Sequence, residues 1–419
     1  MNRLVANLVQ ILTLAPGIVE RIPSCRFTRT ATQLHPLMLL FCLSLFILLV
    51  VVASAVELCL GNRQLLWLKT VPPFTGDSGP HVLVIIAACN EEKKIEQGVQ
   101  SMLGQDYKNL RIVVINDRST DRTGSILDRL ARAHPRLRVI HNAELPVGWL
   151  GKNHALYLGT QQANSEIFLF VDADIIMDAT TISRAVQHLQ REQLDHLTLT
   201  GHLRMPGILL QMFAGAFVLF FGFFAKPWKA KDPRSKRHIG IGTFNMVRAE
   251  VYRRAGTHQA IAMRPDDDLM LGKLIKKHGY RQEVLLASDL VSVEWYSSFK
   301  ELCRGLEKNS YAGLNYNPAL AVGATIAQWL VFVWPFIGMF VTSGVAQALN
   351  MAACLVLVMI YRDNAGFHGL KRWHGVALPF TTLLFSFVIW RSIVLTIKND
   401  GIDWRGTRYR LSELKANRV

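Results

Sequence analysis

Apolar and amphipathic segments alternate between residues 81 and 174, and this alternation limits the fold more than any other feature of the sequence. The apolar segments are rich in Val, Ile, Leu and Phe, which is typical of strands that are buried on both faces. Strands that alternate with helices predict an α/β domain with a mostly parallel sheet, covered by helices on both sides. The four predicted strands are 81–88, 110–117, 136–142 and 166–174.

The ends of these strands carry amide and carboxylate side chains. In an open parallel sheet such ends line one crevice, where ligands bind. Two carboxylates at positions i and i+2 suit a hard divalent cation, Mg²⁺ or Mn²⁺, which keeps ligand positions free for substrate phosphates. The alternative is a solvated turn after a strand, and a single Asp-x-Asp pair does not decide between them. The residues concerned are Asn90, Glu91, Asp117, Asp172 and Asp174.

Long apolar runs predict membrane segments on both sides of this domain. We expect a retained transmembrane anchor over 36–60, where Glu57 is the one charged residue. The segment 1–35 is mildly amphipathic and is expected at the membrane surface. Residues 319–397 are predicted to hold the C-terminal transmembrane helices, and 398–419 a basic tail.

The C-terminal region contains three apolar runs, 320–346, a short one at 348–361, and 375–395. A further run, 206–228, lies inside the predicted domain at 62–315. A span there would put the two halves of the domain on opposite sides of the membrane. We therefore expect an interfacial helix, with a span as the alternative.

Composition agrees with a domain joined to membrane helices, because half of the 419 residues are hydrophobic. The net charge of +16 indicates contact with anionic lipids or a phosphate-bearing substrate. It is equally typical of the Lys/Arg excess on cytoplasmic faces of membrane proteins. The six cysteines show neither zinc-site spacing nor a disulfide framework. Charges are rare inside the apolar runs, which argues against a transporter or channel, and no nucleic-acid partner is expected.

The strand ends resemble those of the family 2 glycosyltransferases with the GT-A fold. The resemblance covers roughly 80–315 and is carried by "AACNEEKKIEQGVQSMLGQDY", "IVVINDRSTDRT" and "VDAD". In that family a segment like PxYNEE ends the first strand, and its proline is absent here. The acid after the second strand recognises the base, and the DxD motif binds the metal and the sugar-nucleotide diphosphate. The resemblance implies nucleotide-sugar binding by Asn90, Glu91, Asp117 and Asp172, and metal binding by Asp172 and Asp174.

Two further segments extend the resemblance. "GWLGKNHALYLG" is similar to the family's GKxxALNxG and implies that Lys152 neutralises a phosphate, with a solvent-exposed lysine as the alternative. "RPDDDLMLGKLIKKHGY" is similar to EDxxLxxRLxxxG and implies that Asp268 is the catalytic base, with Asp267 as second choice. Neighbouring acids would raise the pKa of such a base, which suits proton removal from an acceptor hydroxyl. The alternative is that residues 266–268 cap the following helix.

One departure from the family pattern bears on the product. Processive members carry QxxRW after the base, whereas "CRGLEKNSYAGLNY" stands here, which argues against polymer synthesis. Arg304, Lys308 and Asn309 are candidates for diphosphate or acceptor contacts; a polar helix at the membrane surface explains them equally well. Gly240 and Gly242 are expected to let the backbone approach the substrate closely.

Together these features predict a membrane-bound inverting glycosyltransferase that moves a sugar from a nucleotide-sugar donor to a lipid acceptor. It is most similar to the hopanoid-associated, carotenoid-acid and ceramide glucosyltransferase-like groups. A membrane polysaccharide or oligosaccharide synthase is the first alternative, and a catalytically silent nucleotide-binding scaffold is the second. By the same resemblance we expect a multi-pass protein of the inner cell membrane with its catalytic domain in the cytoplasm.

Overall fold

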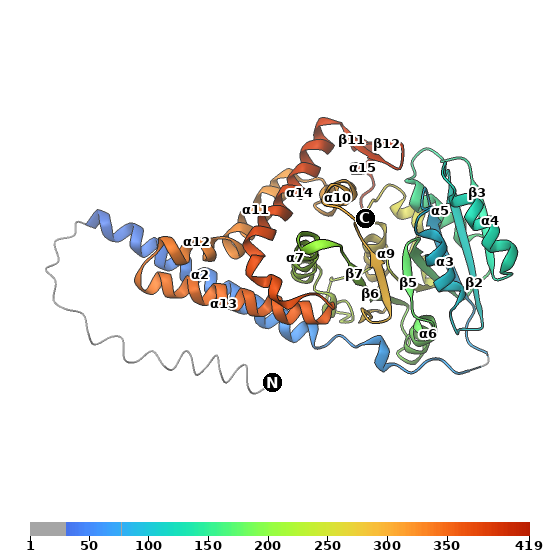
Figure 1. Cartoon of the computed structure of the whole chain (residues 1–419), viewed down its shortest axis with the longest axis horizontal. Helices are drawn as coiled ribbons and strands as arrows, with labels where there is room; N and C mark the ends of the chain where they lie inside the picture. The colour runs from blue at the N-terminus through green and yellow to red at the C-terminus, as the bar shows by residue number, and fades with distance from the viewer. Residues whose placement is uncertain (1–30, 77) are drawn as a thin grey trace. The chain divides into compact units, whose positions relative to one another are not determined.

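A computed structural model describes residues 31–76 and 78–419, with side chains from Leu37 onward (Figure 1). Apart from its last residues, the predicted surface segment 1–35 lies outside this range. The chain divides into two compact units, Met1–Leu43 and Ser44–Val419. The described part of the first unit is the beginning of helix α2, Ala31–Asn62. The following paragraphs concern the second unit.

The second unit is built on a seven-stranded sheet in the order β3-β2-β1-β4-β8-β6-β9. All neighbouring strands are parallel except β8, which is antiparallel to both β4 and β6. The prediction of a mostly parallel sheet is therefore confirmed. The strands are β1 Val82–Ala88, β2 Leu110–Asp117, β3 Leu137–Asn142, β4 Ile167–Asp172, β6 His196–Thr200, β8 Asn245–Arg248 and β9 Gln282–Leu286.

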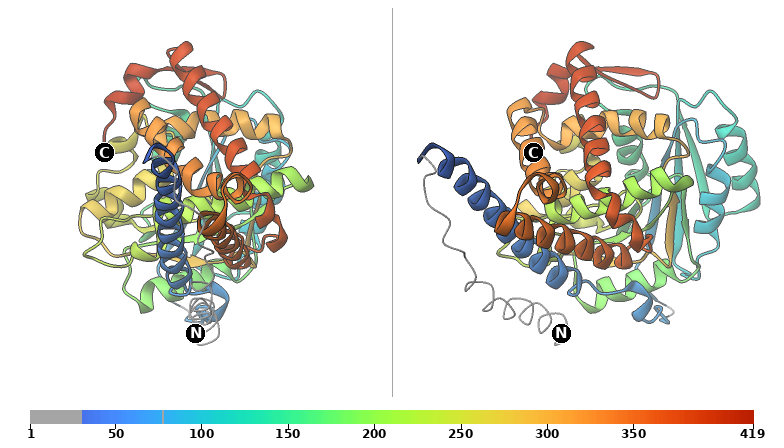
Figure 2. Two further views of the ribbon diagram at one scale, coloured as in Figure 1. Left: turned by 90° about the vertical axis from the view of Figure 1, so that its left-hand side faces the viewer. Right: turned by 60° about the vertical axis from the view of Figure 1, so that its left-hand side comes forward.

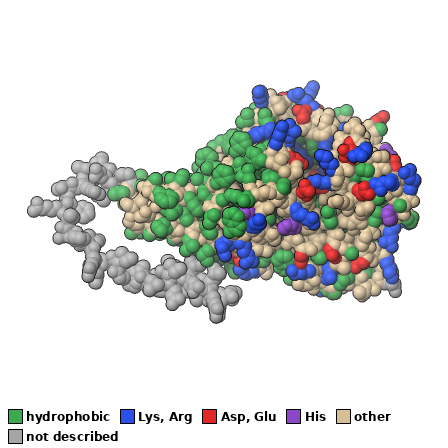
Figure 3. Space-filling view, in the orientation of Figure 1, with side chains coloured by type: hydrophobic (Ala, Val, Ile, Leu, Met, Phe, Trp, Pro, Cys, Tyr) green, Lys and Arg blue, Asp and Glu red, His purple; other side chains and the backbone are tan. Residues whose placement is uncertain are grey.

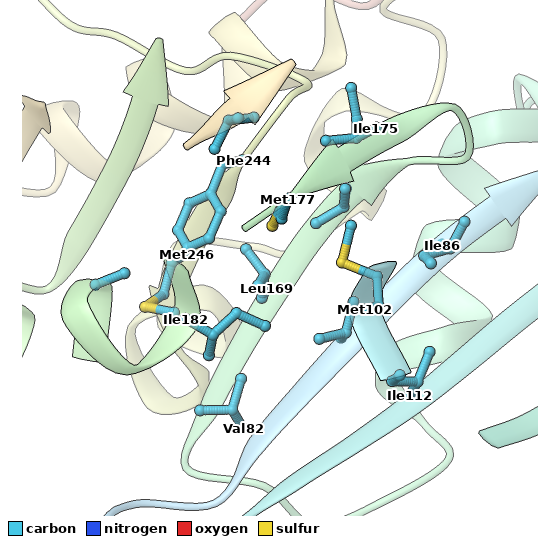
Figure 4. Close-up of a cluster of buried hydrophobic side chains, with 14 of the residues drawn as sticks. Val82, Ile86, Met102, Ile112, Leu169, Ile175, Met177, Ile182, Phe244 and Met246 are labelled. Carbon is cyan, nitrogen blue, oxygen red and sulfur yellow. The ribbon is translucent and has the colours of Figure 1, made fainter. Parts of the chain in front are cut away.

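Helices cover both faces of this sheet (Figures 1 and 2). Successive side chains of a strand point to opposite faces, so Ile86 and Ile85 enter two different cores. Figure 4 shows the Ile86 side, where Met102 and Leu169 pack together. Helices α3 Ile95–Leu103, α4 Thr123–Ala133 and α6 Thr181–Arg191 supply the first core, and α5 Gly151–Thr160, α8 Ala249–Arg254 and α9 Asp267–Lys277 the second.

A three-stranded sheet lies beside the main one and has the order β5-β10-β7. Its strand β5 follows β4 after a turn of two residues, so the two acids predicted to bind metal lie at this turn. The strands are β5 Ile175–Met177, β7 His202–Arg204 and β10 Val291–Glu294. Short 3₁₀ helices lie at Leu68–Thr70, Pro227–Lys229, His258–Ile261 and Arg372–Ala377.

Within the described residues, four helical segments are long enough and apolar enough to span a membrane: Leu37–Asn62, Gly207–Lys229, Gly344–Phe367 and Arg372–Lys398. They contain helices α2, α7 Gly207–Ala225, α13 Gly344–Phe367 and α14 Leu378–Lys398. The amphipathic helix α10 Phe299–Gly313 leads into this region. In Figure 3 hydrophobic side chains cover the surface over the C-terminal helices, whereas charged side chains gather over the sheet.

The predicted span at 320–346 is broken into two helices, α11 Pro318–Phe332 and α12 Trp334–Val341, with a bend of 48°. Pro335 explains the break, because proline cannot donate the backbone hydrogen bond that a continuous helix needs. The neighbouring run, expected to be short, forms the 24-residue helix α13 instead. Apolar length alone therefore revealed neither the bend in the first segment nor the full length of the second.

The segment after α14 is folded. Strands β11 Gly401–Trp404 and β12 Thr407–Arg410 form an antiparallel hairpin, and helix α15 Leu411–Ala416 follows. Leu411 and Leu414 are buried together with Leu150 of the sheet domain. Residues 398–419, predicted as a basic tail, thus pack against that domain.

Candidate active site

All predicted site residues line one cavity of about 1470 Å³ at the carboxyl ends of β1, β2 and β4. They come from six separate segments of the sequence, which only the folded sheet and its helices bring together. This shared cavity is the strongest structural support for treating them as one site. The residues are Asn90, Glu91, Asp117, Lys152, Asp172, Asp174, Asp267, Asp268, Arg304, Lys308 and Asn309.

Asp172 and Asp174 stand at the end of β4 and in the turn that follows it. The Asp172 amide donates a hydrogen bond to the Gly242 carbonyl (3.0 Å), which fixes the backbone where the strand ends. The Asp174 carboxylate lies 3.7 Å from the ammonium of Lys94. Burial, together with repulsion from Asp172 and Glu91, raises the pKa of Asp174 to about 6. Asp174 therefore binds a proton more readily than an ordinary aspartate.

Lys152 lies in the first turn of α5, but its ammonium contacts carboxylates. Its Nζ is 2.8 Å from Asp172 Oδ1 and 3.2 Å from Asp267 Oδ2. Burial alone would lower the pKa of Lys152, but Asp172, Asp267 and Asp268 more than offset this and raise it. Lys152 therefore stays charged and joins β4 to the start of α9.

The three consecutive acids at the start of α9 have different partners. Asp266 forms a buried two-point ion pair with Arg264 (2.8 and 2.7 Å), so both its oxygens are engaged. Asp267 pairs with Lys152, and burial raises its pKa. Asp268 has no described cation partner and accepts hydrogen bonds from the amides of Gly242 and Leu269 (both 2.7 Å).

Burial and the adjacent Asp267 carboxylate raise the pKa of Asp268 to about 7. A carboxylate of this kind removes a proton near neutral pH more readily than an ordinary aspartate. Among the three acids, Asp268 is therefore the one whose environment best suits a general base. The capping alternative holds in part, because Asp268 Oδ1 accepts a hydrogen bond from the first turn of α9.

The two glycines before β8 have a structural reason that differs from the expected one. A Cβ atom at Gly240 would lie 1.8 Å from the Asp268 carbonyl oxygen, and one at Gly242 would lie 2.4 Å from Asp172 Oδ2. The loop therefore needs glycine because it packs against the acidic residues themselves. The structure adds this contact to the expected one: both glycines also line the cavity, and their close approach to the substrate stays a prediction.

The ends of β1 and β2 are tied to each other. Asn90 has a left-handed backbone (φ 56°), and its side chain accepts a hydrogen bond from the Thr120 amide (2.8 Å). The buried Asp117 is engaged on both oxygens by Arg118 (3.0 and 2.7 Å), and Asn142 also donates to it (2.8 Å). A ligand at Asp117 therefore meets a carboxylate that is already oriented and partly neutralised.

Helix α10 contributes a polar wall to the cavity. The ammonium of Lys308 lies 3.8 Å from the centre of the Trp404 ring, and no carboxylate among the described residues pairs with it. Loss of solvation lowers the pKa of Lys308 to about 8. Asn309 Oδ1 is buried and has no hydrogen-bond partner within the described part of the chain. Both groups are thus available to an anionic or polar ligand.

Three cavity residues were missed by the sequence reasoning. Lys94 lies beside Asp174, and Arg118 pairs with Asp117. Both cations could have been suspected from the sequence, because they lie within the motif segments "NEEKK" and "NDRST". Arg405 forms an ion pair with Glu91, which lies more than 300 residues away in the sequence. No local sequence pattern predicts such a long-range contact.

The donor set at the turn after β4 fits a divalent cation. Asp172 and Asp174 supply hard oxygen ligands, and Mg²⁺ commonly uses one or two carboxylates together with substrate phosphates. No group of three His, Cys, Asp or Glu side chains within the described ranges is placed to hold a metal. A cation here would therefore depend on oxygen ligands from the substrate.

The parallel sheet, the acids at its strand ends and the acidic start of α9 define a glycosyltransferase domain with the GT-A fold. Residues 83–256 match the family model described as glycosyl transferase family 2, so this part of the chain carries a domain of that family. The recognition made from the sequence motifs is confirmed.

Relatives by sequence are glycosyltransferases as well. The chain is 35% identical over 122 residues to an uncharacterized glycosyltransferase of Haemophilus influenzae, a match that covers 29% of this chain and 36% of that one. It is 24% identical over 283 residues to the 4,4'-diaponeurosporenoate glycosyltransferase of Staphylococcus haemolyticus, which covers 66% and 72% of the two chains. The first of these matches thus spans about a third of the relative's length.

The chain is similar to the mannosyltransferase PcManGT from Pyrobaculum calidifontis, in complex with GDP-Man and Mn²⁺, with a TM-score of 0.49 and 20% sequence identity. The likeness covers 86% of this chain and 98% of that one.

The raised pKa of Asp268 predicts how activity depends on pH. The base must be ionised, so kcat/KM should fall about tenfold per pH unit below pH 7 and level off above it. Initial rates of sugar transfer between pH 5 and 8, at saturating Mn²⁺ so that Asp174 stays ionised, measure this. A rate that is constant between pH 5.5 and 7 would contradict the assignment.

Proposed function

We propose that this protein is a membrane-bound inverting glycosyltransferase that moves a sugar from a nucleotide-sugar donor to a hydroxyl of a lipid. The cavity carries this proposal, because it joins the acidic crevice of a family 2 glycosyltransferase domain to the apolar helices. Family membership supports the transfer reaction, and the apolar part of the cavity supports the lipid acceptor.

The donor lies in the crevice at the strand ends. Asn90, Glu91 and Asp117 bind the nucleoside side, while Asp172 and Asp174 face the diphosphate. Asp172 and Asp174 would hold a divalent cation, Mg²⁺ or Mn²⁺, which would supply positive charge to the leaving diphosphate. Arg304, Lys308 and Asn309 of α10 line the opposite wall, where Lys308 provides a cation without a carboxylate partner among the described residues.

The chemical step is one displacement at the anomeric carbon. Asp268 accepts the proton of the acceptor hydroxyl, whose oxygen forms the new bond to that carbon. The bond to the phosphate oxygen breaks on the opposite face, and the nucleoside diphosphate leaves with the electron pair. The Gly242 and Leu269 amides hold the Asp268 carboxylate in one orientation for this role. One displacement inverts the configuration of the sugar.

The acceptor reaches the site through the apolar part of the cavity. Phenylalanines of α7 line it, and Phe220 packs against Phe332 of α11 and Phe385 of α14 (ring centres 5.0 and 5.1 Å apart). Helix α10, which carries Lys308, is fastened to α14 by the ion pair between Glu307 and Arg391 (2.8 Å). An apolar chain lying among these helices would bring its polar end to Asp268.

Sheet pairing restricts how α7 lies in the membrane. Strand β6 precedes α7 and β8 follows it, yet these two strands pair with each other. A single crossing by α7 would separate them, so we place α7 at the membrane surface, as the sequence predicted. Helix α7 packs against α13 and α14, and half of its most apolar stretch is buried.

The C-terminal hairpin imposes a similar restriction on the last helices. Because it contacts the sheet domain, the chain crosses the membrane an even number of times between α10 and β11. Helix α12 packs along α13, whereas α14 packs on α10 and α7. We therefore assign one crossing to the bent pair α11–α12 and one to α13, and place α14 beside α7 at the surface. With a crossing by α2, the domain and the C-terminal segment share the cytoplasmic side.

The first test of the function is sugar transfer by the purified full chain in detergent. Radiolabelled UDP- and GDP-sugars, a lipid extract and Mn²⁺ should give a labelled lipid, and EDTA should abolish it. Asp268→Asn should lower the rate by about 10²- to 10⁴-fold, because the base is lost. Asp106→Asn, which alters an exposed aspartate outside the cavity, should leave the rate unchanged.

Two other results would contradict the proposal. A labelled water-soluble polymer would favour a polysaccharide synthase. Folded protein that neither transfers sugar to lipid nor hydrolyses any of the donors would favour a silent nucleotide-binding scaffold.

The membrane arrangement predicts which side of the membrane a single cysteine faces. In a variant free of native cysteines, Ser343→Cys in the α12–α13 loop should react with an impermeant maleimide from outside. Asn399→Cys, after α14, should react only in inverted vesicles. Both positions are exposed, so the comparison is matched. Labelling of Asn399→Cys from outside would mean that α14 crosses the membrane.

A further inference from the structure

The hairpin after α14 is shaped to present one side chain at its tip. Trp404 pairs with Thr407, so the turn contains only Arg405 and Gly406. Both have positive φ, 52° and 79°, as a two-residue turn between twisted antiparallel strands requires. A non-glycine residue in this conformation is uncommon, and such positions are often found where function fixes the geometry.

Three contacts fasten the hairpin to elements that carry the candidate site. The contacting residues are Arg118, Gly151 and Lys308. Arg118 and Gly151 are the sequence neighbours of the candidate residues Asp117 and Lys152, and Lys308 is itself a candidate residue. The position of the tip is therefore set by the site itself. The contacts are Arg118 Nη1 to Thr407 Oγ1 (3.0 Å), the Gly151 amide to the Tyr409 hydroxyl (3.2 Å), and Lys308 Nζ to the Trp404 ring centre (3.8 Å).

At the tip, the Arg405 guanidinium lies over the end of β1. It donates hydrogen bonds to the Cys89 carbonyl and the Glu91 carboxylate, and it is 3.4 Å from the Asn90 carbonyl. Its side chain lines the cavity and is 42% exposed, so one face of the guanidinium remains accessible to a ligand. The carboxylate of Asp174 is close enough to act on the charge of Arg405.

The cations around the cavity differ in how they are engaged. Lys152 lies between the Asp172 and Asp267 carboxylates, and Arg118 is held by the buried Asp117. Arg405 pairs with one partly buried glutamate at the cavity wall, and Lys308 has the Trp404 ring in place of an acid. Arg405 and Lys308, like the exposed Arg304 of the same cavity, are thus cations that an incoming anion can recruit without breaking a buried ion pair.

We propose that Arg405 is a donor-binding residue, which the β11–β12 hairpin inserts into the site so that its guanidinium binds the diphosphate of the nucleotide sugar. Guanidinium groups suit this role because their forked donors match two phosphate oxygens at once. Trp404 holds Lys308 beside the same group, so the hairpin supplies the wall that closes the donor site. This inference deepens the proposed function and rests on it.

Binding of UDP and GDP to the full chain in detergent, with Mn²⁺ and without acceptor, tests the proposal by calorimetry. Arg405→Gln should weaken binding of the preferred nucleoside diphosphate by about 10- to 100-fold, as expected for a lost hydrogen bond to a charged group. Arg405→Lys, which keeps the charge but not the fork, should lie between this variant and the unmodified protein. Arg408→Gln alters another exposed arginine of the hairpin, one outside the cavity, and should bind normally.

Binding of the free nucleoside separates a phosphate contact from a merely structural role. Arg405→Gln should bind uridine or guanosine as the unmodified protein does, because only the phosphate contact is lost. Equal weakening for nucleoside and nucleoside diphosphate would show that Arg405 only positions the hairpin, and would overturn the proposal. Unchanged diphosphate binding would overturn it as well. If Arg405→Gln does not fold, Arg405→Lys is measured instead. Its loss of affinity for the nucleoside diphosphate is then compared with its loss of affinity for the nucleoside in the same way.

Failure of the proposed function gives a different result. In that case the unmodified protein binds neither UDP nor GDP, and the variants have nothing to change. Tight binding by the unmodified protein together with normal binding by Arg405→Gln rejects the role of Arg405 alone.

Discussion

The ammonium of Lys152 is the interaction on which the rest of the site depends. It joins α5, the end of β4 and the start of α9 through Asp172 and Asp267. Buried carboxylates that crowd together repel each other strongly unless a cation lies among them. Lys152 therefore allows the fold to bring its acidic segments into one crevice. Asp268, which this ammonium does not contact directly, keeps the raised pKa that suits a base.

The same crevice opens toward the apolar helices, so the site and these helices form one unit. Helix α10 carries polar residues into the cavity on one side and is tied to α14 on the other. The hairpin after α14 then returns to the strand ends. The residues proposed for the donor site, the base and the acceptor path thus come from segments far apart in the sequence, and a change in the helices would alter the geometry at the strand ends.

Much of the domain could be predicted from the sequence, because buried strands and the polar residues that follow them are local patterns. Those patterns, with the family resemblance, assign residues 90–91, 117, 172–174 and 267–268 to one site, and all of these segments line one cavity. The charge partners were harder to find. The ion pairs of Lys152 with Asp172 and Asp267 were not predicted, since ion pairs depend on tertiary packing, and its contact with a phosphate stays a prediction. The bend at Pro335 was overlooked because the apolar run continues through it.

The measurement that tests the account most directly is the anomeric configuration of the product. A single displacement, with Asp268 as base and the diphosphate leaving from the opposite face, turns an α-linked donor sugar into a β-linked one. Proton NMR of the purified glycolipid reads this configuration from the coupling of the anomeric proton. The account predicts a β-linkage. An α-linked product would show that the configuration is retained through two steps or a different mechanism, and would contradict the single role given to Asp268.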